Sequence, residues 1–265
     1  MTAGKIYRAV GLMSGTVLDG EIDVALIETD GHQLVRALDF YTHPYAGDVR
    51  DKVRACFGKR TPDAATATAE KLVTDLHIDA VLSSGYNAEI IGFHGQTITH
   101  APADQFTWQL GDSARLARET GIDVVGDLRQ ADIQAGGQGA PLLPLYHAAR
   151  LADHPRPVAI LNLGGVANIT FIDDEQIIAF DTGPANALMD DYMRIHYRQS
   201  FDNHGAIAAQ GTVQQDILRT FLQDPFLAQT GPKSLDRNHW DLSWVDSLAP
   251  EDAMATLLAL STGSI

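Results

Sequence analysis

The sequence contains only one cysteine, Cys56, among its 265 residues. A single cysteine cannot form an intrachain disulfide, and a cysteine-rich metal site is also excluded. Cys56 lies in the run DVRDKVRACFG, within a segment, 47–58, that we expect to be helical. Free cysteines are among the most frequently buried residues, so we expect an unreactive core thiol.

Basic residues are scarce as well. The chain has 19 Lys and Arg against 34 Asp and Glu, giving a formal net charge of −15. Nucleic acid and anionic membrane surfaces are bound through clustered Lys and Arg, so neither is expected as a main partner.

Long apolar runs are missing too. No stretch approaches the roughly 18 residues of a membrane-spanning helix. The N-terminal residues MTAGKIYRAVGLM do not have the basic segment and apolar core of a signal peptide. We therefore expect a cytoplasmic protein with one large domain or two smaller ones.

Several familiar catalytic signatures are absent. The sequence has no GxSxG elbow, no Cys–His pairing and no GxxxxGK[ST] motif, which argues against serine hydrolases, thiol enzymes and P-loop proteins. It also lacks HExxH, which makes a zinc site improbable.

The first 45 residues predict a three-stranded antiparallel meander. The strand ending in GLM leads into the loop SGTVLDG, the strand IDVALIET, a Thr-Asp-Gly turn and the strand QLVRALDF. Helices are expected over 47–58 and 62–78, followed by strands in AEIIGFHG, FTWQLG and IDVVGD. We expect HGQTITHAP and LRQADIQAGGQGAPLLP to be loops, and 112–120 to be a helix.

A second meander begins near residue 157, after an expected helix over 141–151. Its strands are VAILNLGG, VANITFI and QIIAF, and its first turn again carries glycines. The helix PANALMDDYMRIHY follows, with Pro184 expected in its first turn, and further helices surround GTVQQDILRTFL and EDAMATLLALS. The two halves are alike in kind, which suggests duplication, although no close residue repeat is present.

Each glycine loop has two interpretations. In SGTVLDG, glycines allow close backbone approach, Ser14 and Thr16 offer hydroxyls, and Asp19 offers a carboxylate for hydrated Mg²⁺ near phosphates. In LNLGGVAN, Gly164 and Gly165 lie between strands. Either loop alone favours an ordinary turn, but two such loops in like positions favour a nucleotide clamp.

The motif FDTGPAN carries a carboxylate, Asp181, at an expected strand–helix junction. Asp181 is interpreted either as a cap of the following helix or as a general base.

A dense run of hydrogen-bonding side chains in HGQTITHAP suits a polyhydroxylated ligand. This run contains His94, Gln96, Thr97 and His100, and the long loop adds Arg129, Gln130, Asp132 and Gln138. Arg129 is a candidate partner for a ligand carboxylate, and a surface salt bridge is the alternative.

Six blocks in order resemble the anhydro-N-acetylmuramic acid kinases of bacterial cell-wall recycling. These blocks are GLMSGTVLDG, IGFHGQTITHAP, QLGDSARLARETGIDVVGDLRQADIQAGGQGAPLLP, LNLGGVANIT, FDTGPANALMD and KSLDRNHWDLSW. The resemblance implies a two-lobed α/β fold like that of the actin, hexokinase and Hsp70 ATPases, which is ribonuclease H-like. The lobes would be 1–140 and 141–265.

The resemblance also implies the reaction and the site. ATP phosphorylates O6 of 1,6-anhydro-N-acetylmuramic acid while water opens the anhydro bridge at C1, with Asp181 as the general base. The phosphate loops would be Gly15, Thr16, Val17, Leu18, Asp19 and Gly20 and, in the second lobe, Gly164 and Gly165. The sugar would contact His94, Gln96, Thr97 and Arg129, and Mg²⁺, held by Asp19, would neutralise phosphate charge. A homodimer is also implied.

The chain departs from the family pattern in two respects. Val17 stands where a serine is commoner, and Glu21 is an extra residue that we expect the loop to absorb, since one residue inserted in a strand reverses its faces. Family members also continue beyond the equivalent of Ile265, so the second lobe is expected to be incomplete. Two alternatives follow: a catalytically impaired sugar-binding remnant, or another sugar kinase of the same superfamily.

Overall fold

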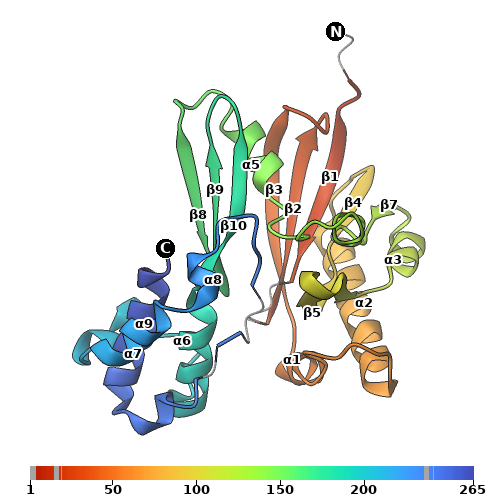
Figure 1. Cartoon of the computed structure of the whole chain (residues 1–265). Helices are drawn as coiled ribbons and strands as arrows, with labels where there is room; N and C mark the ends of the chain where they lie inside the picture. The colour runs from red at the N-terminus through yellow and green to blue at the C-terminus, as the bar shows by residue number, and fades with distance from the viewer. Residues whose placement is uncertain (1–3, 15–17, 19, 236–238, 241) are drawn as a thin grey trace. The chain divides into compact units, whose positions relative to one another are not determined.

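The computed structural model describes residues 4–14, 18, 20–235, 239–240 and 242–265. Its internal contacts divide the chain into two units, Met1–His154 and Pro155–Ile265, and each is described by itself (Figure 1). The sequence predicted a lobe boundary between residues 140 and 141. The first unit instead extends to His154, so helix α5 (Pro144–Arg150) belongs to it.

The first unit is built on a five-stranded mixed sheet. The strands β1 (Tyr7–Met13), β2 (Glu21–Thr29) and β3 (Val35–Pro44) form the antiparallel meander expected from the sequence. The parallel strands β4 (Ile90–Phe93) and β7 (Asp123–Val125) extend it beyond β1, giving the order β3-β2-β1-β4-β7.

The longer helices of this unit pack against the sheet around a first apolar core. α2 (Ala64–Ser84) packs against β2 and β3, and α3 (Ser113–Thr120) packs against α2 and β7. Val10, Val24 and Ile91 of the sheet are at most 1% exposed in this core. α2 is longer than the expected 62–78 because it continues to Gly85, whose left-handed φ of 65° ends it.

A two-stranded hairpin corrects one expectation. HGQTITHAP is not a loop, because its residues 96–101 form β5 (Gln96–Ala101), which pairs with β6 (Phe106–Leu110). The pairing shifts register between Thr97 and Thr99, and Ile98 at that irregularity is buried in a second apolar cluster.

Two shorter helices complete this unit. α1 (Gly47–Arg54) is followed by Cys56, which is fully buried as expected, and burial raises the pKa of its thiol. α4 (Gln130–Gln134) interrupts the long segment expected to be a loop, and its Ile133 is fully buried.

The second unit begins with the other expected meander. β8 (Val158–Leu163), β9 (Val166–Ile172) and β10 (Ile177–Pro184) are antiparallel in the order β10-β9-β8. The sequence predicted Pro184 in the first turn of the next helix. That prediction is wrong, because Pro184 is the last residue of β10. The strand extends this far because Pro184 still pairs with Val166.

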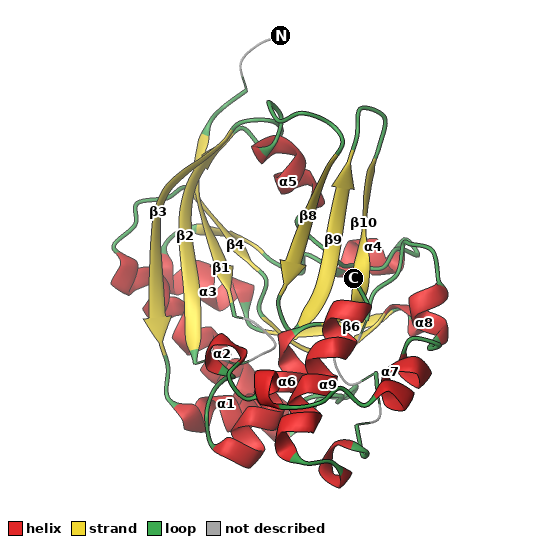
Figure 2. Ribbon diagram, turned by 90° about the vertical axis from the view of Figure 1, so that its left-hand side faces the viewer, coloured by secondary structure: helices red, strands yellow, loops and turns green. Residues whose placement is uncertain are grey.

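Helices follow this meander and form a separate core. They are α6 (Asn186–Tyr192), continued by a π-helical turn over Met193–Tyr197, α7 (Gln215–Phe221), α8 (Pro225–Ala228) and α9 (Pro250–Gly263). Figure 2 shows α6 and α9 beside each other, and Met193, Met254 and Leu257 fill the core between them. In the part of the chain that the structure describes, no helix has both the length and the apolar character needed to cross a bilayer.

Candidate functional site

Asp181 lies inside β10, at the point where the strand is irregular. Its register against β9 shifts between Asp181 and Gly183, and its side chain is only 6% exposed. The following helix, α6, has Ala185 as its N-cap residue, with no side-chain cap hydrogen bond. The capping interpretation of Asp181 is therefore wrong for α6, and the strand does not end at this carboxylate.

A later segment of the same unit holds Asp181 through backbone groups. The N–H of Leu235 donates to Asp181 Oδ2 at 2.8 Å, and the N–H of Asp181 donates to the carbonyl of Lys233 at 3.0 Å. Together these two hydrogen bonds hold the backbone of Asp181 and one oxygen of its carboxylate in place.

Lys233 brings a cation into this buried region. Its Nζ donates to the carbonyl of Phe226 at 2.8 Å and lies 4.5 Å from the centre of the Phe226 ring. Burial lowers the pKa of the Lys233 ammonium, and the Asp181 carboxylate opposes that shift. The carboxylate thus has a positive charge as a neighbour.

Most of the first glycine loop lies outside the described residues, including Gly15, Thr16, Val17 and Asp19. Leu18 is 1% exposed, with φ of 55°, and its side chain packs in the second apolar cluster of the first unit. Only the backbone of Leu18 therefore remains to contact a ligand.

Gly20 closes this loop with a left-handed φ of 99°, and its carbonyl accepts from the N–H of Tyr45 at 2.7 Å. β2 then starts at Glu21, and Ile22 and Val24 are both buried. The apolar face of β2 is thus directed at the core from its second residue onward.

The second glycine loop is tied to the start of α6. The carbonyl of Gly164 accepts from the N–H of Asn186 at 2.9 Å, and the carbonyl of Gly165 accepts from the N–H groups of Ala185 and Ala187. The side chain of Asn186 donates to the carbonyl of Leu163 at 2.7 Å. These bonds occupy N–H groups at the beginning of α6, so phosphate contacts would have to come from the N–H groups of the loop itself.

His94 and Arg129 are in direct contact in the first unit. Arg129 Nε donates to His94 Nε2 at 2.8 Å, and His94 Nδ1 lies 2.8 Å from the carbonyl of Gly95. A carbonyl only accepts, so the proton of the neutral ring is on Nδ1. Burial, with a smaller effect of the Arg129 guanidinium, lowers the pKa of His94 to about 4.

Arg129 and the segment after it form a folded turn. Its Nη1 donates to the carbonyl of Gly139, whose N–H donates to Asp132 Oδ2 at 2.6 Å. Two nitrogens of the Arg129 guanidinium thus donate to an imidazole and to a carbonyl.

Polar side chains also follow one face of the β5–β6 hairpin. Gln109 Nε2 donates to the hydroxyls of Thr97 and Thr107, and Gln130 Nε2 donates to the carbonyl of Thr107 at 2.9 Å. Gln96, only 2% exposed, begins β5. The structure therefore brings the expected sugar-contacting residues of the first unit onto neighbouring elements.

Four further residues of these contacts are not predicted by any sequence pattern above: Thr107, Gln109, Lys233 and Leu235. Thr107 and Gln109 alternate along FTWQLG, a period of two that marks one face of a strand. Lys233 and Leu235 lie in a block that carried the resemblance, but no local pattern pairs that block with Asp181 across 54 residues.

No group of three or more His, Cys, Asp or Glu side chains able to hold a metal is found over the ranges that the structure covers. Mg²⁺ needs only one or two protein carboxylates when phosphates and water supply its other ligands, and Asp19 is outside those ranges.

Comparison with known proteins gives a consistent result over nearly the whole chain. A family model described as "Anhydro-N-acetylmuramic acid kinase" matches residues 7–265. The protein of that name from Rhizorhabdus wittichii is 47% identical, over 97% of this chain and 74% of the relative. Those from Zymomonas mobilis and Rhodospirillum rubrum are each 44% identical over 97% of this chain, covering 75% and 70% of their own lengths.

A solved structure, a reductive activator for corrinoid, iron-sulfur protein, superposes with a TM-score of 0.29 at 11% identity. It covers 69% of this chain and 32% of its own, and a similarity this weak carries no argument about the fold.

Proposed function

The chain belongs to the anhydro-N-acetylmuramic acid kinase family, and on that premise we propose that it phosphorylates 1,6-anhydro-N-acetylmuramic acid with ATP. The anhydro bridge is opened by water, and the products are N-acetylmuramic acid 6-phosphate and ADP. Membership makes the protein a sugar kinase, that is, a phosphotransferase. The match favours this function over a sugar-binding remnant.

Asp181 is the general base of the proposal. Its carboxylate takes a proton from the water that attacks C1, the C1–O6 bond breaks, and O6 forms a bond to the γ-phosphorus as ADP leaves. The observation that carries this role is the buried carboxylate held by the Leu235 N–H. One oxygen is fixed by that bond, so the carboxylate is oriented before the substrate arrives.

The glycine loops are the proposed phosphate sites. Gly15 to Gly20 would contact ATP in the first unit, and Gly164 and Gly165 in the second. Support comes from the shared order of the two units, each of which starts with a meander whose first turn carries glycines. Mg²⁺ enters with ATP as part of the substrate and offsets phosphate charge, and Asp19 is the proposed protein ligand.

The sugar is proposed to contact His94, Gln96, Thr97 and Arg129. His94 is neutral at physiological pH because burial keeps the pKa of its imidazole near 4. Its two ring nitrogens are already bonded to Gly95 and Arg129, so the ring is proposed to contact the sugar through its carbon atoms while it orients the guanidinium. Arg129 remains charged and offers further N–H donors to the lactyl carboxylate of the sugar.

The proposal also covers the fold of the two units, the oligomeric state and the location of the protein. We infer an actin-like, ribonuclease H-like fold of two related lobes, a homodimer, and a cytoplasmic location. The mixed α/β sheet of the first unit and the second meander are in keeping with this fold. Sedimentation of the purified chain tests the dimer.

The Asp181→Asn variant tests the catalytic assignment. Asn keeps the shape and an oxygen that accepts from the Leu235 N–H, but it cannot take a proton. In an assay that couples ADP release to a colour change, kcat should fall by about 10²–10⁴-fold, the usual contribution of a general base.

Asp224→Asn is a matched control in the same unit. Asp224 accepts from the N–H of Phe226 at the start of α8 and from Trp240 Nε1, so this variant should affect stability but not kcat. An Asp181→Asn enzyme with unchanged kcat would remove Asp181 from the mechanism.

A further inference from the structure

A small cavity lies inside the first unit, beside the residue that begins the first glycine loop. Its volume is about 10 Å³, at the lower limit for one water molecule. Its lining is almost entirely apolar, but Ser14, Tyr45, His77 and Gln96 are among the lining residues. The cavity therefore has about the size of one water molecule, and whether it holds one depends on the polar atoms of these few lining residues.

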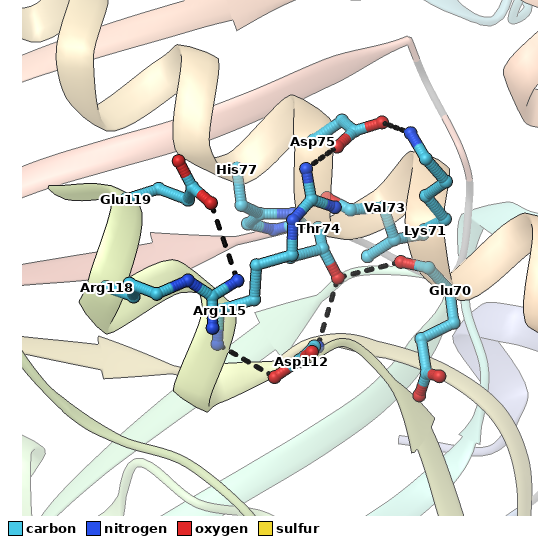
Figure 3. A network of polar contacts seen from close by, with 10 residues as sticks. All are labelled: Glu70, Lys71, Val73, Thr74, Asp75, His77, Asp112, Arg115, Arg118 and Glu119. Atoms are coloured by element: carbon cyan, nitrogen blue, oxygen red, sulfur yellow. Dashed lines mark hydrogen bonds and ion pairs between the residues drawn. The ribbon is translucent and has the colours of Figure 1, made fainter.

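His77, a lining residue of this cavity, has a buried acceptor without a partner in the part of the chain that the structure describes. Its Nδ1 lies 2.7 Å from the carbonyl of Val73, one turn earlier on α2 (Figure 3), so Nδ1 carries the proton of the neutral ring. His77 is 1% exposed, and its Nε2 has no hydrogen-bond partner among the described residues. An unprotonated Nε2 needs a donor.

Ser14 supplies a second unpaired group. It follows β1 directly, is 6% exposed, and its Oγ also has no partner within the described ranges. Gln96 makes one long contact from Nε2 to the carbonyl of Thr97, at 3.4 Å. A buried polar group without a partner costs roughly 1–3 kcal/mol, so two such groups beside one cavity call for a shared partner.

We propose that one water molecule occupies this cavity, donates to His77 Nε2, accepts from the Ser14 hydroxyl and bonds the Gln96 amide. The water joins α2, the end of β1 and the start of β5 into one polar node. His77 is then a positioning residue: it fixes Ser14, from which the first glycine loop departs. This last step rests on the proposed phosphate role of that loop.

A crystal structure of the full chain tests the node itself. We expect electron density for one water within hydrogen-bonding distance of both Ser14 Oγ and His77 Nε2. A dry cavity, with the two side chains apart, would overturn the proposal.

Kinetics of Ser14→Ala, His77→Leu and the double variant test the positioning role. Each single variant should raise the KM for ATP about 5–10-fold, and the double variant should add little, because both remove the same node. Single effects that multiply in the double variant would contradict a shared node.

Thr74→Val is the matched control. Thr74 is a fully buried residue of α2, but its hydroxyl bonds the N–H of Asp112 and the carbonyl of Glu70, not the cavity (Figure 3). It should lower the midpoint of urea denaturation and leave the KM for ATP unchanged. An ordered water and non-additive denaturation midpoints would support the node itself. An unchanged KM for ATP in every variant would then refute the inference that the node positions the first glycine loop.

Discussion

The polar side chains on which this account depends are buried and are held by backbone groups. Asp181 accepts from the N–H of Leu235, Lys233 donates to the carbonyl of Phe226, and His77 bonds the carbonyl of Val73. Backbone groups in regular or tightly packed segments move less than side chains do. Fixed partners of this kind preorganise a site, since little rearrangement is left for the moment of reaction.

The neighbouring charge of Lys233 can be tested by Lys233→Met. Methionine keeps the apolar stem but removes the cation beside Asp181 and the bond to the carbonyl of Phe226. The acid limb of the kcat profile should move to higher pH, because a carboxylate that loses a nearby cation takes up a proton more readily.

Lys233→Arg keeps the charge and serves as the control for that measurement. The two variants should differ in their pH profiles even where their stabilities are similar. Identical profiles for the methionine and wild-type enzymes would show that Lys233 does not act on Asp181.

Burial of His77 predicts a pH-dependent stability. Its pKa is lowered to about 4 in the folded state, against about 6.5 when unfolded. Between these values the unfolded chain takes up a proton that the folded chain does not. The free energy of unfolding should therefore fall by about 3 kcal/mol on His77's account as the pH drops from 6.5 to 4.

Urea denaturation across this range, compared between wild type and His77→Gln, measures the effect. In the variant, the pH dependence of the free energy of unfolding should come only from other groups, including His94, whose pKa is also about 4. Equal slopes of the free energy of unfolding against pH in the two proteins would contradict a contribution from His77.

At the scale of elements, the two meanders followed from the sequence, because alternating residues and glycine turns specify antiparallel strands locally. β5 did not, since its pairing with β6 depends on how Ile98 packs across the fold. α4 was missed for a similar reason: the tertiary burial of Ile133 holds five residues in a helix that local propensity does not favour.

The candidate site shows the same limit. Single motifs indicated Asp181, His94 and Arg129, but the contact between Arg129 and His94 joins residues 35 apart. Such pairs form only when separate elements meet, which no local pattern encodes.

Glycine positions allow a matched test of the turn that starts β5. Gly95 and Gly121 have nearly equal φ, 69° and 72°. A Cβ at Gly95 would lie 2.5 Å from the carbonyl oxygen of Leu110, whereas a Cβ at Gly121 would meet no atom of the described residues within 4 Å apart from its chain neighbours. Gly121→Ala should cost about 1–2 kcal/mol for the left-handed backbone alone. Gly95→Ala should cost clearly more, because the hairpin must also shift.

Urea denaturation of the two alanine variants measures this difference. Equal losses of stability would mean that the β5–β6 hairpin yields without cost and does not fix the residues it carries.

At the scale of the whole molecule, the family assignment rests on a match from residue 7 to residue 265 and on relatives up to 47% identical. The proposed residues are divided between the units, with the sugar-contacting set in the first and Asp181 in the second. Each set is internally ordered by hydrogen bonds, between Arg129 and His94 in the first unit and between Leu235 and Asp181 in the second.

The central claim is that phosphorylation and hydrolytic ring opening occur together. Incubating the protein with ATP, Mg²⁺ and 1,6-anhydro-N-acetylmuramic acid in ¹⁸O-labelled water, followed by mass spectrometry, tests it directly. The account predicts N-acetylmuramic acid 6-phosphate carrying one ¹⁸O at C1, with one ADP formed for each product molecule. Phosphorylated sugar that retains the anhydro bridge, or ADP formed equally without the sugar, would contradict it.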